Sequence, residues 1–198
     1  TGILPCWVSH SCAATAGAAE GGKKPRVAAV QQVKLEEYRL PNGLRVVLAP
    51  DHYAPVVAIS VTYNVGSRNE RPGRTGLSHL FEHMMFKGAK KYGPGVFDST
   101  VEARGGFSNA FTTEDMTGYH ETFPSEALDL VIDMEADRMA SMQISEDNLK
   151  SEREVVKEER RLRTDSTPTG LIEESFRAMF WQAHPYSWPV IGWMSDID

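Results

Sequence analysis

The chain has 198 residues, of which 41% are hydrophobic and 24% charged, and its formal net charge is -6 at pH 7. This composition is typical of a folded acidic domain and not of a disordered segment, and the lack of a basic stripe argues against nucleic acid as a partner. No apolar run in the sequence approaches the ~20 residues that a membrane-spanning helix needs.

Residues 1–32 are rich in alanine and glycine and show no periodicity, so we expect a flexible leader or the remnant of a signal sequence. Cleavage-like sites around "AATAGAA" favour an exported, periplasmic or extracellular protein, with an organellar or cytoplasmic protein as the alternatives. Only two cysteines occur, Cys6 and Cys12. A bridge between them and a small metal loop with His10 are both open, but two thiols in a flexible leader are favoured.

The first predicted elements are strands. Order begins near Val33, and two strand-like runs flank the turn residues Pro41, Asn42 and Gly43, which is a hairpin pattern. The β-branched run over residues 54–67 then predicts a central strand.

A helix is expected next, in "GLSHLFEHMMFKG", residues 76–88. Thr75 or Ser78 is expected to cap its start, and Gly88 ends it after Phe86. A shorter helix is predicted in "GPGVFDSTVEARGG", residues 93–106, between a glycine–proline start and a double glycine.

The second half of the chain is predicted to hold a hairpin and three helices. Residues 107–123 read as two strands with a turn near Glu114. Leu128, Val131, Ile132, Met139 and Met142 have helical spacing, and further helices are expected over 145–163 and 171–183. Strands followed by helices mixed with hairpins predict an α+β fold with a largely antiparallel sheet packed against helices.

Two histidines four residues apart carry the first chemical indication. On a helix His79 and His83 share a face, and Glu82 lies on the same side. Leu77, Leu80, Phe81, Met84 and Met85 would cover the other directions, so this helix is expected to be buried on more than one side. Core histidines bonded to backbone carbonyls are the structural alternative, and the pattern alone does not decide between them.

A third metal ligand is expected from "SEREVVKEERRLR", residues 151–163. On a helix Glu152 and Glu159 share a stripe with Leu149, Val156 and Arg163, while a second stripe suits solvent and holds Lys150, Arg153, Lys157 and Arg161. Two inward carboxylates repel each other unless a cation lies between them. Glu159 as a direct ligand, with Glu152 orienting a histidine, is a consistent arrangement; the alternative is an exposed helix with solvated glutamates.

These motifs together resemble the pitrilysin/insulinase family of zinc metallopeptidases, which carries an inverted H-x-x-E-H motif. His79 to His83 is followed 76 residues later by Glu159, and "GGFSNAFTTEDMTGYHETFP" and "HPYSWPVIGW" resemble two further family segments. The resemblance covers residues 33–198, which we expect to form the N-terminal domain of such an enzyme, with its C-terminal end truncated.

The resemblance implies a role for each matched residue. His79, His83 and Glu159 would bind one Zn²⁺ per chain, and Glu82 would be the general base. Glu152 would orient a ligand. A substrate peptide would pair with an edge strand at Asn109 and Ala110. Phe107 and Phe111, by contrast, are expected to be packed in the core.

The family resemblance also implies a partner, because members work with a second half in the same chain or in a homologous subunit. We therefore expect a zinc endopeptidase acting on peptides or unfolded segments, complete only with its other half. A non-catalytic peptide-binding or assembly subunit of the same fold is the alternative, and a purely structural zinc domain is a third reading that Glu82 weakens, since it suits a base and not a ligand.

Overall fold

The computed structural model describes residues 34–198, so the expectations for the leader, including Cys6, Cys12 and His10, lie outside the described residues. The chain divides into two units, residues 1–51 and 52–198, and each is described by itself. In the described part of the first unit, β1 (Glu36–Arg39) and β2 (Arg45–Leu48) form an antiparallel hairpin, which confirms the prediction.

The second unit is built on a three-stranded antiparallel sheet of β3 (Val56–Tyr63), β4 (Phe107–Thr112) and β5 (Thr117–Pro124), in the order β3-β5-β4. The strand predicted over residues 54–67 is present as β3, but its predicted central position is wrong, because β5 lies in the middle of this sheet. β4 has a strand neighbour on one side only within residues 34–198, so its other edge offers unpaired backbone groups.

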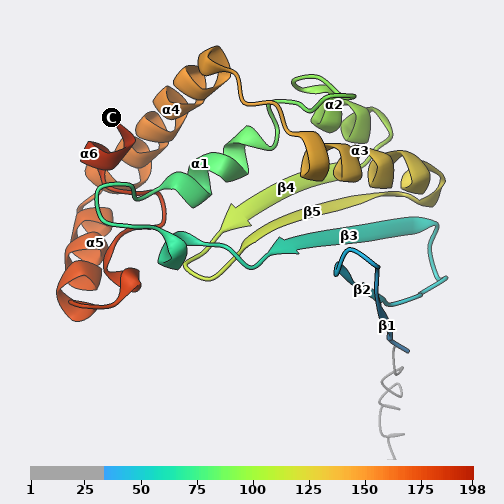
Figure 1. Cartoon of the computed structure of the whole chain (residues 1–198), viewed down its shortest axis with the longest axis horizontal. Helices are drawn as coiled ribbons and strands as arrows, with labels where there is room; N and C mark the ends of the chain where they lie inside the picture. The colour runs from blue at the N-terminus through green and yellow to red at the C-terminus, as the bar shows by residue number, and fades with distance from the viewer. Residues whose placement is uncertain (1–33) are drawn as a thin grey trace, which may run out of the picture. The chain divides into compact units, whose positions relative to one another are not determined.

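Three helices lie along one side of this sheet: α1 (Leu77–Met84), α2 (Val96–Ala103) and α3 (Leu128–Ser141) (Figure 1). A core between α2, β5 and α3 contains Phe97, Val101, Phe123, Val131 and Met134. Helices packed on an antiparallel sheet confirm the predicted α+β class.

Side chains alternate along β4, and this alternation corrects one expectation. Phe107 and Phe111 are 57% and 41% exposed, so the prediction that they pack in the core is wrong. Both rings instead flank His120 of β5, with ring centroids 6.3 and 6.2 Å away.

The rest of the chain forms α4 (Glu146–Arg160), a π-helical turn (Arg161–Asp165), α5 (Pro168–Phe180) and α6 (Met194–Ile197). Ser145 caps α4, accepting a hydrogen bond from the Asn148 amide at 3.1 Å. Short 3-10 turns cover Ser67–Asn69, Ser125–Ala127 and Pro185–Ser187. None of the helices between residues 34 and 198 has both the length and the apolar composition needed to cross a bilayer.

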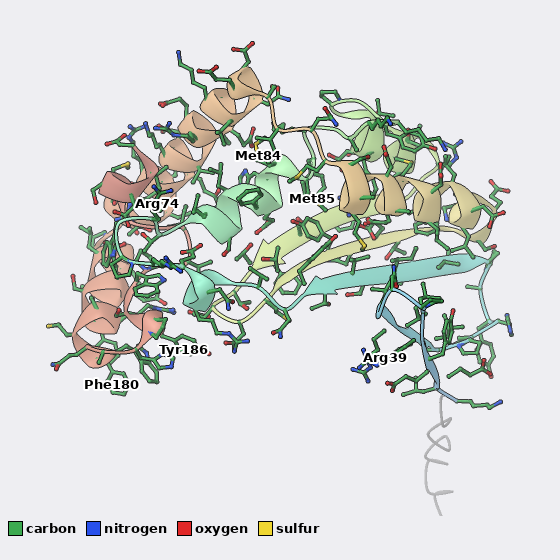
Figure 2. The ribbon with its side chains drawn as sticks, viewed as in Figure 1. Arg39, Arg74, Met84, Met85, Phe180 and Tyr186 are labelled. Atoms are coloured by element: carbon green, nitrogen blue, oxygen red, sulfur yellow. The ribbon has the colours of Figure 1, made fainter. Side chains whose placement is uncertain are left out.

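A second core joins α1 to α4, because Leu80 and Met84 pack with Val156 and Ile197. Met84 and Met85 lie at the C-terminal end of α1 (Figure 2) and are both buried. Leu77 and Phe81 are 41% and 44% exposed, so the expectation that α1 is covered in all these directions is wrong for those two residues.

Two charged side chains are more deeply buried than the patterns predicted. Lys157, assigned to the solvent stripe of α4, is buried because Glu154 and Asp198 pair with its ammonium at 2.9 and 2.8 Å. On α3, Ile132 and Met139 are exposed, and Arg138 takes the place of an apolar residue on the inner face.

The start of α1 is held by distant residues, and neither predicted cap is used. Gly76 is the N-cap, and the Glu70 carboxylate accepts hydrogen bonds from the amides of Gly76 and Ser78 at 2.8 and 2.7 Å. The Thr75 hydroxyl instead donates to Asp196 at 2.7 Å. Gly76 has a φ of 87°, and a Cβ there would lie 2.4 Å from the Ile191 carbonyl, so a side chain is excluded.

Candidate functional site

The three predicted metal ligands come together between α1 and α4. His79 and His83 lie one turn apart on α1, and Glu159 is on the last turn of α4. The Nε2 atoms of His79 and His83 lie 3.6 and 3.4 Å from the same oxygen, Oε2 of Glu159. Within residues 34–198 this is the group of potential ligands close enough to hold a metal ion.

The spacing of these atoms suits zinc. Ligands placed ~2.0–2.2 Å from zinc at tetrahedral angles are ~3.3–3.6 Å from each other, which agrees with the separations of 3.6 and 3.4 Å. A direct N–H···O hydrogen bond is usually shorter, about 2.9–3.0 Å. Two imidazoles and one carboxylate are also a donor set that catalytic zinc takes while keeping a fourth position open.

Burial and charge set the protonation of the histidines. Burial, aided by the nearby His83, lowers the pKa of His79 to about 4, so its imidazole is neutral near pH 7. Burial also disfavours the charged form of His83, but the carboxylates of Glu159 and Glu152 outweigh it and raise its pKa. An ion that binds to Nε2 of His83 therefore competes with the proton of that imidazole.

Two of the three candidate ligands, His83 and Glu159, also contact a second side chain outside the metal position. Glu152 Oε1 lies 3.0 Å from Nδ1 of His83, and the Lys87 ammonium lies 2.6 Å from the other oxygen of Glu152. Arg163 pairs with Oε1 of Glu159 at 2.7 Å. Such contacts fix the ring or carboxylate so that the remaining atom faces the metal position.

His79 Nδ1 is a buried nitrogen without a hydrogen-bond partner in the described part of the chain. Its ring is 8% exposed and its Nε2 faces Glu159. A ligand imidazole normally donates its second N–H, so Nδ1 of His79 differs in this respect from Nδ1 of His83, which lies beside Glu152.

Glu82 lies beside the ligands but is not one of them. It is 9% exposed, and burial raises the pKa of its carboxyl while the Thr112 hydroxyl, which donates to Oε2, opposes that rise. A poorly solvated carboxylate next to a metal position is suited to accept a proton from water.

The site opens into a cleft of about 700 Å³ whose walls come from α1, β4, α4 and α5. Glu82 and the three candidate ligands line it, and so do Asn109 and Ala110 of β4. Asn109 bonds locally, its side-chain oxygen accepting from the Ala110 amide at 2.8 Å. The cleft thus connects the open edge of the sheet with the metal position.

The sequence patterns did not give a role to Thr112, Lys87 or Arg163. Thr112 shares a face of β4 with Ala110, two residues away, and that alternation is a usable indication. Lys87 lies one helical repeat after His83, and Arg163 follows Glu159 by four residues, so helical spacing places both near the ligands.

This fold and this site define a class of protein. The chain belongs to the insulinase family, peptidase family M16, whose sequence profile matches residues 45–192. The family resemblance drawn from the motifs is therefore confirmed.

Several relatives are curated as zinc proteases. The chain is 42% identical over 165 residues to the zinc protease PqqE of Helicobacter pylori, a match that covers 83% of this chain and 37% of that protein. It is 31% identical over 158 residues to the uncharacterized zinc protease YmxG of Bacillus subtilis, covering 80% of this chain and 38% of the relative. The chain thus spans less than two fifths of the length of these relatives.

Solved structures agree with the fold. A crystal structure of a protease from Helicobacter pylori has a TM-score of 0.79 at 42% identity, over 83% of this chain and 40% of that one. The periplasmic protease PqqL of Escherichia coli has a TM-score of 0.75 at 25% identity, over 86% of this chain and 20% of that one.

Proposed function

We propose that this chain carries the zinc-binding catalytic part of an endopeptidase that hydrolyses peptides or unfolded segments. The main observation behind the proposal is that His79, His83 and Glu159 lie close enough to bind one metal ion. Glu82 lies beside them, and all four side chains line one cleft. The names of the zinc-protease relatives support it.

The zinc would be held by the two Nε2 atoms and by Oε2 of Glu159. When bound, zinc lowers the pKa of a coordinated water to about 7 and polarises a carbonyl. Glu152 accepts the Nδ1 proton of His83 and so keeps Nε2 directed at the metal position.

Glu82 would move the protons of the reaction. Its carboxylate accepts a proton from the attacking water and then donates that proton to the leaving amine. A peptide added to the open edge of β4 at Asn109 and Ala110 would bring its scissile bond into the cleft, because backbone pairing fixes its position along the strand.

We further propose that residues 33–198 form the N-terminal domain, with residues 1–32 a leader, and that a second half completes the enzyme. The relatives' greater length supports this. An apolar stripe on α5 also supports it: Ile172, Phe176, Met179 and Phe180 are 61–70% exposed and lie on one helix face. Phe180 lies near Tyr186 at the end of α5 (Figure 2).

We propose that the protein is exported, and the similarity to a periplasmic protease supports this. Fractionation of the native organism into cytosol and exported proteins tests this. Recovery of the full-length protein in the cytosol with residues 1–32 still attached contradicts it.

Metal analysis and peptide hydrolysis test the catalytic proposal on the natural full-length protein. We expect about one zinc per chain, hydrolysis of a peptide library, and loss of hydrolysis with a chelator. Glu82→Gln should keep the zinc and abolish turnover. A zinc-loaded wild-type protein that cuts no peptide would instead favour the non-catalytic, peptide-binding subunit.

A further inference from the structure

The Glu82 carboxylate is fixed by one contact. Among residues 34–198 the Thr112 hydroxyl is its hydrogen-bond partner, and it donates to Oε2. The other oxygen, Oε1, has no protein partner in this part of the chain and remains available to the cleft that Glu82 lines.

The Thr112 hydroxyl has one proton, and its surroundings direct that proton to Glu82. The nearest other hydroxyl is that of Thr117, with the two oxygens 3.5 Å apart. Thr117 donates its own proton to the Val65 carbonyl at 2.9 Å, so it is at most an acceptor for Thr112, and at 3.5 Å a neutral hydroxyl is a weaker acceptor than the carboxylate of Glu82.

The backbone of Thr112 is held in place by the sheet. It is the last residue of β4 and is paired in register with Thr117 of β5. A β-branched side chain has few χ1 choices, so a backbone held by the ladder also fixes the hydroxyl.

From these contacts we infer that Thr112 is a positioning residue for Glu82. Its hydroxyl holds Oε2 of Glu82 so that Oε1 faces the cleft, where a water would be deprotonated. This inference rests on the proposed peptidase function and adds a specific residue to it. It also links the strand that would receive the substrate to the side chain that would act on it.

Three variants of the natural full-length protein, loaded with zinc, test the inference. Thr112→Val keeps the shape and removes the hydroxyl, and Thr112→Ser keeps the hydroxyl. Thr62→Val makes the same replacement at an exposed position of β3, away from the described contacts of Glu82. For Thr112→Val we expect kcat to fall about 10- to 100-fold, because a small misplacement of a reacting group costs about that much. KM and zinc content should not change.

Thr112→Ser should restore most of kcat, and Thr62→Val should match the wild type. Wild-type kcat in Thr112→Val overturns the inference. An equal loss in Thr112→Ser also overturns it, since packing of the methyl group would then be the cause. Loss of zinc in Thr112→Val would assign the hydroxyl to the metal site and not to Glu82.

Crystal structures of the same variants separate this inference from the proposed function. We expect Glu82 in one rotamer in the wild type and in Thr112→Ser, and in a different or several rotamers in Thr112→Val. An unchanged Glu82 in Thr112→Val refutes the positioning role even if the protein is a peptidase. A wild type that hydrolyses no peptide refutes the proposed function, while the rotamers still decide the role of Thr112.

Discussion

Glu159 uses its two carboxylate oxygens for different purposes. Oε1 pairs with Arg163, and Oε2 faces both imidazoles. Its pKa is lowered mainly by the hydrogen bond with His83 and, against the effect of burial, also by the charge of Arg163. The carboxylate is therefore ionised and aimed before any ion arrives, which reduces the cost of organising the site on binding.

Glu159→Ala should weaken zinc binding more than Glu152→Ala, because only Glu159 is placed as a direct ligand. Loss of an outer partner typically costs 10–100-fold in metal affinity, so we expect about that for Glu152→Ala and a larger loss for Glu159→Ala. Competition with a chromogenic chelator measures both. Glu158→Ala is the matched control, because Glu158 is next to Glu159 but pairs with exposed Arg161. A larger loss of zinc affinity in Glu152→Ala than in Glu159→Ala would exchange the roles assigned to Glu152 and Glu159.

A second prediction at the scale of residues concerns a buried charge cluster between β5 and α3. Arg138 contacts Glu121 and Glu135, and its guanidinium lies 4.1 Å from the centre of the Phe97 ring. Burial, together with Glu135, raises the pKa of Glu121 from 4.5 to about 8. The folded protein thus holds a proton on Glu121 that the unfolded chain releases above pH 4.5.

Stability should therefore fall as pH rises from about 4.5 to 8, by at most ~1.4 kcal/mol per pH unit from this group. Glu121→Gln resembles the protonated form, since its amide can donate to Glu135 and accept from Arg138. We expect this variant to match the wild type near pH 5 and to exceed it near pH 8 in urea denaturation. Parallel pH profiles of the two proteins would contradict the bound proton.

At the scale of elements, local patterns predict those elements whose signals lie within a few residues. The turns at Gly43 and Glu114 and the start of a helix at residue 145 are such cases, and each is confirmed. The cap of α1 was not predictable in this way. Glu70 lies six residues before Gly76, and the Thr75 hydroxyl is occupied by Asp196, 121 residues away.

Removing the distant cap should loosen the helix that carries both histidines. Glu70→Ala leaves the amides of Gly76 and Ser78 without their acceptor, and loss of a cap costs about 0.5–2 kcal/mol. We expect a decrease of that size in the free energy of unfolding and weaker zinc binding. Glu102→Ala, at an exposed position of α2, is the control; equal stability of the two variants would mean that water replaces the carboxylate at no cost.

At the scale of the whole molecule, motif spacing predicted which residues would meet, but not what holds them. His79, His83 and Glu159 were paired correctly in space from two helical patterns. Lys157 and Arg160 were not expected inside, because they pair with Asp198 and with Glu174 of α5, which no local pattern on α4 reveals. The ligand roles themselves stay a prediction until metal is measured.

The isolated 198-residue chain should be a poor peptidase until the rest of the natural protein is supplied. Residues that hold the substrate from the opposite side are expected in the second half. Hydrolysis by the chain alone, by the chain mixed with the missing part, and by the intact protein measures this. Full activity of the chain alone would remove the need for a second half.

The hydrogen bond between Thr75 and Asp196 has a consequence for folding during synthesis. Thr75, directly before the N-cap of α1, accepts a hydrogen bond from the Trp193 amide and donates one to Asp196, and Gly76 lies against the backbone of Gly192. The contacts at the start of the histidine helix are therefore complete only after residue 196 has been synthesised. A nascent chain would thus acquire its ion late, after residue 196 has emerged, and a premature stop upstream of Gly192 should leave a product unable to retain metal.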